Sequence, residues 1–308
     1  MRAALAVLLL GLWPFQAGAA EIGDAYRAWV ASHGAAPATL AVISPEGVLT
    51  EQLGVAAAPS AAMPLASVSK TLAAQCVLDL ARAGALSLAD TLQQHLGWQG
   101  PQGRVTLGAL LTHTSGLWPD STQEGATGRT LRSTRHAERI IEALRTRPLA
   151  TPEHRYNNEN YLVLGDVLRA AGGADPFETC KARAGSWQGL ESLAMAPGTR
   201  ALGMAGGYAG AAPDLARFVA GLEARADWPS VQVAPGVLYG PGVLMRNVPK
   251  GRNMWHFGGI CTRVSAENIG AFVVQLASGW SVAALYSGCQ DAEALLALQR
   301  DILVPLDR

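Results

Sequence analysis

The chain has 308 residues, of which 49% are hydrophobic and 16% charged, and its 24 basic and 24 acidic side chains cancel to a formal net charge of zero. This composition excludes intrinsic disorder, and the length suffices to bury a large core without a disulfide scaffold or a structural metal. No run of Lys or Arg provides an electrostatic footprint for phosphate backbones or anionic lipid, so nucleic acid is not an expected partner.

The first 19 residues have the features of a secretory signal peptide. Met1 and Arg2 precede an apolar run over 3–15, and Ala17 and Ala19 offer small residues at the spacing that a signal peptidase reads. A membrane anchor is the alternative, but roughly 18–20 apolar residues are needed to span hydrocarbon. We therefore expect cleavage of residues 1–19, and a secreted or periplasmic domain over 20–308 without a membrane span.

The pattern along the rest of the chain places strands at both ends and helices between them. The expected helices cover 21–33, 67–84 and 291–303, and the expected strands cover 39–43, 48–53, 255–261, 271–276 and 281–286. Between 86 and 220, short helices are separated by Gly and Pro. The predicted fold class is α/β of the α+β kind: an antiparallel sheet from about 38–54 and 255–288, flanked by helices, with a helical insertion over about 85–220.

The four cysteines lack the spacing of a metal site. No CxxC or HExxH pattern occurs, so neither a metal nor another cofactor is expected. Cys76 lies in an apolar helical stretch, and we expect it to stay reduced as a small buried side chain. Cys261 and Cys289 bracket two strands that should pair, which makes them the expected bridge; the sequence alone leaves all three full pairings open.

The first of three chemical motifs is Ser67-Val-Ser-Lys70, at the start of the helix predicted over 67–84. Positions i and i+3 share one helix face, so Lys70 can reach the hydroxyl of Ser67 and take its proton. A helix-capping serine with a surface lysine is the alternative. The apolar residues that follow favour burial, and burial makes a lysine available as a neutral base.

The other two motifs are Tyr156-Asn-Asn158, just before a helical stretch, and His256-Phe-Gly-Gly259 on a late strand. Asn157 or Asn158 could simply cap the helix. Glycines weaken a strand interior unless another group must approach its backbone closely, as an oxyanion hole requires.

Together these motifs resemble those of the serine β-lactamase and penicillin-binding protein superfamily, on the branch of class C β-lactamases, D-Ala-D-Ala carboxypeptidases, D-aminopeptidases and class VIII-type esterases. Further blocks in family order support the resemblance: 64–70, 84–90, 105–117, 160–165, 206–218 and 256–259.

The resemblance implies a role for each motif residue. Ser67 would be the acylated nucleophile, Lys70 its base and Tyr156 a proton shuttle, while Asn158 would position the acyl side of the substrate. The backbone N–H groups of Ser67 and Gly259 would form the oxyanion hole beside Gly258. His113, in His-Thr-Ser-Gly, looks like a structural turn rather than a base.

The third motif departs from the family pattern. His256 stands where many relatives have Lys, and Phe257 stands where many have Ser or Thr, so we expect weak carboxylate recognition and an apolar subsite at Phe257.

The expected function is that of an exported serine hydrolase, an esterase or peptidase, which cleaves an ester or amide of a small molecule or peptide. The alternatives are a D-amino-acid peptidase or carboxypeptidase, a β-lactamase, a penicillin-binding protein without turnover, and a structural protein that has lost the chemistry.

Overall fold

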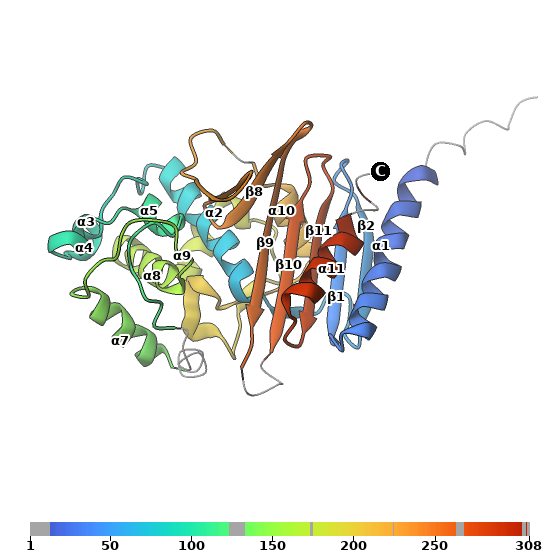
Figure 1. Ribbon diagram of the computed structural model, residues 1–308, viewed down its shortest axis with the longest axis horizontal. Coiled ribbons are helices and arrows are strands. Elements are labelled where there is room, and N and C mark those ends of the chain that lie inside the picture. The colour runs from blue at the N-terminus through green and yellow to red at the C-terminus, as the bar shows by residue number, and fades with distance from the viewer. Residues whose placement is uncertain are drawn as a thin grey trace, which may run out of the picture.

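The computed structural model describes residues 13–122, 133–172, 175–223, 225–262, 268–303 and 306 (Figure 1). The strands are β1 (Ala38–Ile43), β2 (Leu49–Val55), β3 (Ala62–Pro64), β4 (Ala194–Met195), β5 (Tyr208–Ala211), β6 (Val231–Ala234), β7 (Val237–Gly240), β8 (Val243–Val248), β9 (Gly251–Ile260), β10 (Ile269–Gln275) and β11 (Ser281–Ser287). The helices are α1 (Trp13–Ser32), η1 (Ala66–Val68), α2 (Ser69–Arg82), α3 (Leu92–Leu96), α4 (Gly100–Gly103), α5 (Leu107–Leu111), α7 (Thr134–Leu144), α8 (Asn158–Gly172), α9 (Pro176–Arg183), η2 (Gly185–Trp187), η3 (Arg200–Ala205), α10 (Ala212–Ala220) and α11 (Ala292–Leu303).

The main sheet is antiparallel and joins the two ends of the chain, which confirms the predicted fold class. Its strand order is β2-β1-β11-β10-β9-β8-β7-β6, so the first strand pairs with the last. Ala38 lies opposite Tyr286, and Ile43 lies opposite Ser281. The two strands predicted over 39–43 and 48–53 are β1 and β2, and they pair antiparallel.

Helices cover both faces of the sheet (Figure 1), and alternating side chains of its strands pack into two separate cores. On β1, Leu40 and Val42 pack in the cluster that includes residues of α1 and α11, whereas Ala41 and Ile43 pack with residues of α2 and α10 on the other face. This period of two is what strands buried on both sides require. The candidate site lies on the α2 side.

The sheet is larger than the sequence pattern indicated, because β6, β7 and β8 extend it beyond β9. The turn between β7 and β8 packs against α2: the hydroxyl of Thr71 donates to the carbonyl of Gly242 at 2.7 Å. Gly242 has φ +68°, and a Cβ built there would lie 2.5 Å from the carbonyl oxygen of Lys70. This close approach brings β7 next to the helix that carries Lys70.

The N-terminal helix begins earlier than predicted, at Trp13 rather than residue 21. The predicted signal peptide falls partly on residues 1–12, outside the described residues, and its cleavage stays a prediction. Within the described part of the chain, no helix combines the length and the apolarity that crossing a membrane demands.

One of the two cysteine expectations is confirmed and the other is wrong. Cys261 and Cys289 form a disulfide across the β9–β11 end of the sheet, with their Cα atoms 5.3 Å apart. Cys76 is not reduced but bonded to Cys180, with a Cα–Cα distance of 5.5 Å. The pairing depends on the packing of α9 beside α2, which a local apolar pattern does not reveal.

Candidate active site

Ser67 lies in η1, immediately before α2, and its side chain is partly exposed. The preceding residue, Ala66, has φ +45°, a conformation that costs energy for a residue with a Cβ. Its side chain is fully buried in a small cluster with Leu202, Ile260 and Ile269. This packing holds the strained turn that presents Ser67 at the N-terminal end of α2, where the helix dipole favours negative charge.

Lys70 reaches Ser67 as the i, i+3 spacing predicts: its Nζ lies 3.1 Å from the Ser67 Oγ. The side chain is fully buried, so Lys70 is not the surface lysine of the alternative interpretation. Burial lowers its pKa to about 7, although the negative charge of Asp120 acts in the opposite direction. At neutral pH the uncharged amine is therefore available at this position, unlike in a lysine of ordinary pKa.

The other two partners of the Lys70 amine determine where its lone pair points. Nζ lies 2.7 Å from Oδ1 of Asn158 and 2.6 Å from the carbonyl oxygen of Ala205. Both atoms can only accept, so a neutral amine donates its two hydrogens to them. The lone pair then faces the third neighbour, the hydroxyl of Ser67, and can accept its proton.

Tyr156 lies over the same amine, with the Lys70 Nζ 5.0 Å from the centroid of its ring. Burial raises the pKa of the Tyr156 hydroxyl well above its usual range, and its hydrogen bond with Ser67 acts in the opposite direction. Tyr156 therefore remains a phenol at neutral pH and can donate a proton. Of the two asparagines, Asn157 caps α8, since its Oδ1 accepts from the Glu159 N–H at 2.7 Å.

His256 lies on the site face of β9 as a buried, neutral ring. Its Nδ1 lies 2.6 Å from the carbonyl oxygen of Phe257, an acceptor, so this nitrogen carries the hydrogen. Its Nε2 then accepts from the hydroxyl of Tyr239 at 3.4 Å. Burial and the nearby Lys70 charge lower the pKa of His256 to about 3. The ring thus offers no fixed positive charge at this position of the third motif.

His113 stands behind Tyr239 and supports this arrangement. Its Nδ1 accepts from the Asn157 N–H at 3.2 Å and lies 3.0 Å from the amide nitrogen of Asn160. The hydrogen is therefore on Nε2, which donates to the Tyr239 hydroxyl at 3.2 Å. Burial lowers the pKa of His113 well below its usual range. These contacts make His113 a neutral structural residue, consistent with the turn expected from the sequence.

The two glycines of the third motif occupy different surroundings. A Cβ at Gly258 would lie 2.3 Å from the carbonyl oxygen of Leu65 and 3.1 Å from the Ser67 nitrogen. A Cβ at Gly259 would meet nothing within 4 Å. Gly258 is therefore the residue that lets β9 approach the backbone of Ser67, as the predicted oxyanion hole requires.

The expectation that Phe257 forms an apolar subsite is wrong. Its ring stacks on Phe272 with centroids 4.6 Å apart and packs against the core beneath α1 and α11. Adjacent residues of a strand face opposite sides of the sheet, so with His256 on the site face the Phe257 side chain points away.

Three polar residues next to the motifs were not identified from the sequence. Tyr239 comes from β7, a strand that the sequence pattern did not predict. Asp120 is 4% exposed and accepts from the N–H of Asn158 at 2.8 Å, and the hydroxyl of Thr122 lies 2.9 Å from Nδ2 of Asn158. The only local signal was the turn chemistry of Trp-Pro-Asp after the block that ends at Leu117.

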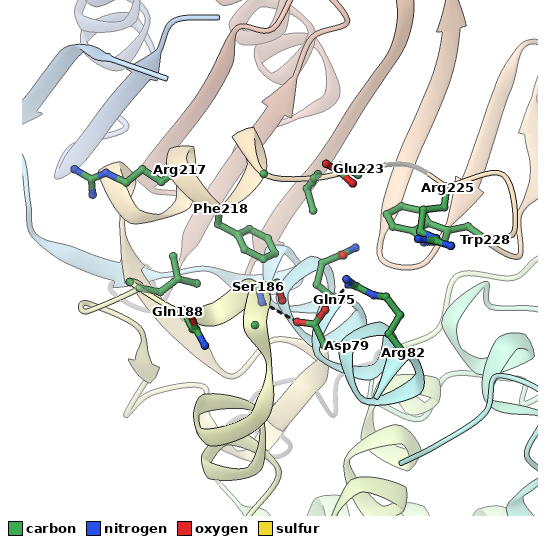
Figure 2. Close-up of a pocket in the computed structure, with 15 residues that line it drawn as sticks. Gln75, Asp79, Arg82, Ser186, Gln188, Arg217, Phe218, Glu223, Arg225 and Trp228 are labelled. Atoms are coloured by element: carbon green, nitrogen blue, oxygen red, sulfur yellow. Dashed lines mark hydrogen bonds and ion pairs between the residues drawn. The ribbon is translucent and has the colours of Figure 1, made fainter. Parts of the chain in front are cut away.

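A separate cavity of about 450 Å³ is lined by residues of α2, η2 and α10 (Figure 2). Gln75, Asp79 and Arg82 of α2 line it, together with Phe218 of α10 and Ser186, whose N–H donates to Asp79 at 2.8 Å. None of the residues that line it belongs to the three motifs. Within the described ranges, no group of three or more His, Cys, Asp or Glu side chains is arranged to hold a metal ion.

A comparison with protein families finds that the Beta-lactamase family matches residues 22–288. Among curated proteins, Protein flp of Staphylococcus aureus (strain MW2) is 28% identical over 120 residues, which are 37% of this chain and 24% of that protein. The match thus spans about a quarter of the length of these curated relatives.

Solved structures with the same fold cover nearly the whole chain. The crystal structure of SurE with D-Leu has a TM-score of 0.70 at 20% identity, over 94% of this chain and 76% of that one. The β-lactamase/D-alanine carboxypeptidase from Pseudomonas syringae has a TM-score of 0.74 at 16% identity, over 94% of this chain and 99% of that one. At these identities the likeness establishes the fold.

Proposed function

The chain belongs to the Beta-lactamase family, and from this premise we propose that it is an exported serine hydrolase that cleaves esters or amides through an acyl-enzyme on Ser67. The observation that carries the proposal is the environment of the Lys70 amine. A buried amine with two obligate acceptors, Asn158 and Ala205, keeps its lone pair for the hydroxyl of Ser67. A serine becomes an effective nucleophile when a positioned base takes its proton.

In the acylation step, Ser67 Oγ attacks the carbonyl carbon of the substrate while its proton passes to Lys70. Negative charge then develops on the carbonyl oxygen, and the N–H groups of Ser67 and Gly259 stabilise it. The bond to the leaving group breaks as Tyr156, a phenol at neutral pH, donates its proton to the departing atom and is reprotonated from Lys70. Water then attacks the acyl-enzyme and gives a proton to the same pair. The bond between the acyl carbon and Ser67 Oγ breaks, the pair returns the proton to Oγ, and the acid is released.

The preferred substrates, we propose, lack a carboxylate beside the scissile bond. Recognition of a carboxylate gains most from a fixed charge, and at this position the neutral His256 already uses both ring nitrogens for Phe257 and Tyr239. A short acyl ester has no carboxylate, so its binding does not need a fixed charge at this position. Cleavage of D-amino-acid amides or peptides is the main alternative, since the fold neighbour SurE was crystallised with D-Leu. The other two alternatives are a β-lactamase and a penicillin-binding protein without turnover.

Short-chain aryl esters should therefore be hydrolysed faster than the cephalosporin nitrocefin. We expect mass spectrometry of the quenched reaction to find the acyl group on the peptide that contains Ser67.

His256→Lys should raise the ratio of nitrocefin turnover to ester turnover, because an ammonium group can hold the carboxylate of nitrocefin. If the wild type turns over nitrocefin with kcat/KM above about 10⁵ M⁻¹s⁻¹, within the range of efficient enzymes, the ester preference is wrong. A stable adduct with penicillin and no turnover of any ester would identify a binder instead.

The pH dependence of ester hydrolysis should report the ionisation of Lys70. Below its pKa of about 7 the amine is protonated and cannot accept the Ser67 proton, so kcat/KM should rise with pH and level off above about 8. One unit below that pKa, the rate should fall by roughly tenfold per further pH unit. His256 is neutral down to about pH 3 and adds no inflection between pH 5 and 9. The measurement is kcat/KM for an uncharged ester across that range; a profile flat down to pH 5 would contradict a lysine base.

A further inference from the structure

Behind Asn158 lies a buried carboxylate that the mechanism above does not use. Asp120, 4% exposed, follows α5 in the chain. Its Oδ1 accepts from both the N–H and the hydroxyl of Thr122, at 3.0 and 2.7 Å, and its Oδ2 accepts from the N–H of Asn158 at 2.8 Å. The carboxylate thus joins the loop after α5 to the first residue of α8.

The direction of each hydrogen bond in this group follows from the carboxylate. A carboxylate only accepts, so the hydroxyl hydrogen of Thr122 points to Asp120. The Thr122 oxygen must then act as the acceptor toward Asn158, whose Nδ2 lies 2.9 Å away. With its nitrogen fixed on Thr122, the amide of Asn158 presents Oδ1 to the amine of Lys70, at 2.7 Å.

The opposite orientation of the amide would impair the base. If Asn158 were rotated by half a turn, its NH₂ group would face Lys70 and donate to the amine's lone pair. That lone pair would no longer be free to accept the proton of Ser67. The orientation of the Asn158 amide therefore decides whether the lone pair of Lys70 is free to accept the Ser67 proton or is taken up by a hydrogen bond from Asn158.

We propose that Asp120 is a positioning residue that acts through Thr122 to fix the amide of Asn158, and so keeps the lone pair of Lys70 on Ser67. This inference rests on the proposed function, in which Lys70 is the base. Asp120 also has a second effect, through its charge.

The groups that interact with the Lys70 amine come from several elements: Asp120 after α5, His113 in the same connection, Tyr156 before α8, Tyr161 in α8 and His256 in β9. Burial lowers the pKa of Lys70, and Asp120 raises it. Since the two histidines have lowered pKa values and remain neutral, Asp120 is the negative charge that opposes the burial of the ammonium.

Two variants separate the charge of Asp120 from its hydrogen bonds. Asp120→Asn removes the charge and the obligate acceptor, so kcat should fall by at least about tenfold. The pH at which activity is half-maximal should also move down by about one unit, because the ammonium loses its neighbouring charge. Thr122→Val keeps the charge and breaks the link to Asn158, so kcat should fall by a similar factor with the pH midpoint unmoved. Thr122→Ser, which retains the hydroxyl, should restore most of kcat.

Asp214 supplies a matched control, because its carboxylate is also buried and accepts from the N–H and the hydroxyl of one residue, Ser192, at 2.8 and 2.6 Å. Asp214→Asn should reduce thermal stability without moving the pH midpoint.

The inference is overturned if Asp120→Asn retains the wild-type pH midpoint and a kcat within twofold of the wild type. Where that variant does not fold, the inference is overturned if Thr122→Val and Thr122→Ser have equal kcat. Failure of the proposed function is a different result: full activity in Ser67→Ala.

Discussion

Replacement of Ser67 by alanine is expected to lower kcat for ester hydrolysis by at least about a thousandfold, and replacement of Lys70 by alanine should cost about as much. The two residues carry out one event, the transfer of the serine proton as the carbonyl is attacked. The double variant should therefore be no slower than the worse single variant by more than a few fold. Steady-state kinetics on an aryl ester measures kcat for the two single variants and the double variant, and thermal unfolding checks that each protein is folded.

Ser69 provides the control for these variants. It lies in the first turn of α2, is fully buried and accepts a hydrogen bond from the N–H of Tyr208 at 3.1 Å. Ser69→Ala removes a buried hydroxyl of the same size without touching the Ser67–Lys70 contact, so its loss in kcat should stay below about tenfold. Wild-type turnover by Ser67→Ala would eliminate the acyl-enzyme mechanism, and losses that multiply in the double variant would show that the two side chains act independently.

A single methyl group at Gly258 should have the second large effect. The Cβ would lie 2.3 Å from the carbonyl oxygen of Leu65, closer than any van der Waals contact permits, so β9 and the turn before Ser67 must move apart. The movement displaces the N–H of Ser67 relative to that of Gly259. Loss of one oxyanion donor costs about a hundredfold to a thousandfold in kcat, and overpacking costs about 1–3 kcal/mol of stability. We expect Gly258→Ala to show both losses.

Gly259→Ala tests whether the position or the substitution itself is responsible. Its added Cβ meets no atom within 4 Å and leaves the backbone N–H in place. The loss in kcat should therefore stay below about tenfold, with little change in the melting temperature. Equal kcat values for the two variants would show that the spacing between β9 and Ser67 does not shape the oxyanion site. Calorimetry and ester kinetics on both proteins give the comparison.

The sequence by itself determined the local features of this protein. The Ser67 to Lys70 contact spans three residues of one helical turn, so spacing alone was enough to predict it. The strands of the central sheet have strong alternating or continuous apolar patterns, since both of their faces are buried. The hairpin pairs depend on short turns, which local residue types specify. The bridge between Cys261 and Cys289 closes such a neighbouring pair.

Strands with weaker local signals were missed. β6 and β7 have only four residues each, with β6 at the edge of the sheet and β7 next to it. Runs this short give little periodicity that could be recognised in the sequence. Their pairing depends on β8 and β9 being already in place. Tyr239, whose hydroxyl contacts Nε2 of His256, could not be assigned while its strand was not recognised.

Only the tertiary structure decided which distant groups surround the reacting atoms. Lys70 meets Asn158 across 88 residues and Ala205 across 135, and Cys76 meets Cys180 across 104. No local pattern encodes these pairs, because each depends on how separately formed helices pack against one sheet. The same packing removes the Lys70 amine from water and lowers its pKa, and it turns Phe257 away from the site. The sequence therefore indicated the candidate catalytic residues, and the packing of the folded chain set their protonation and their orientation.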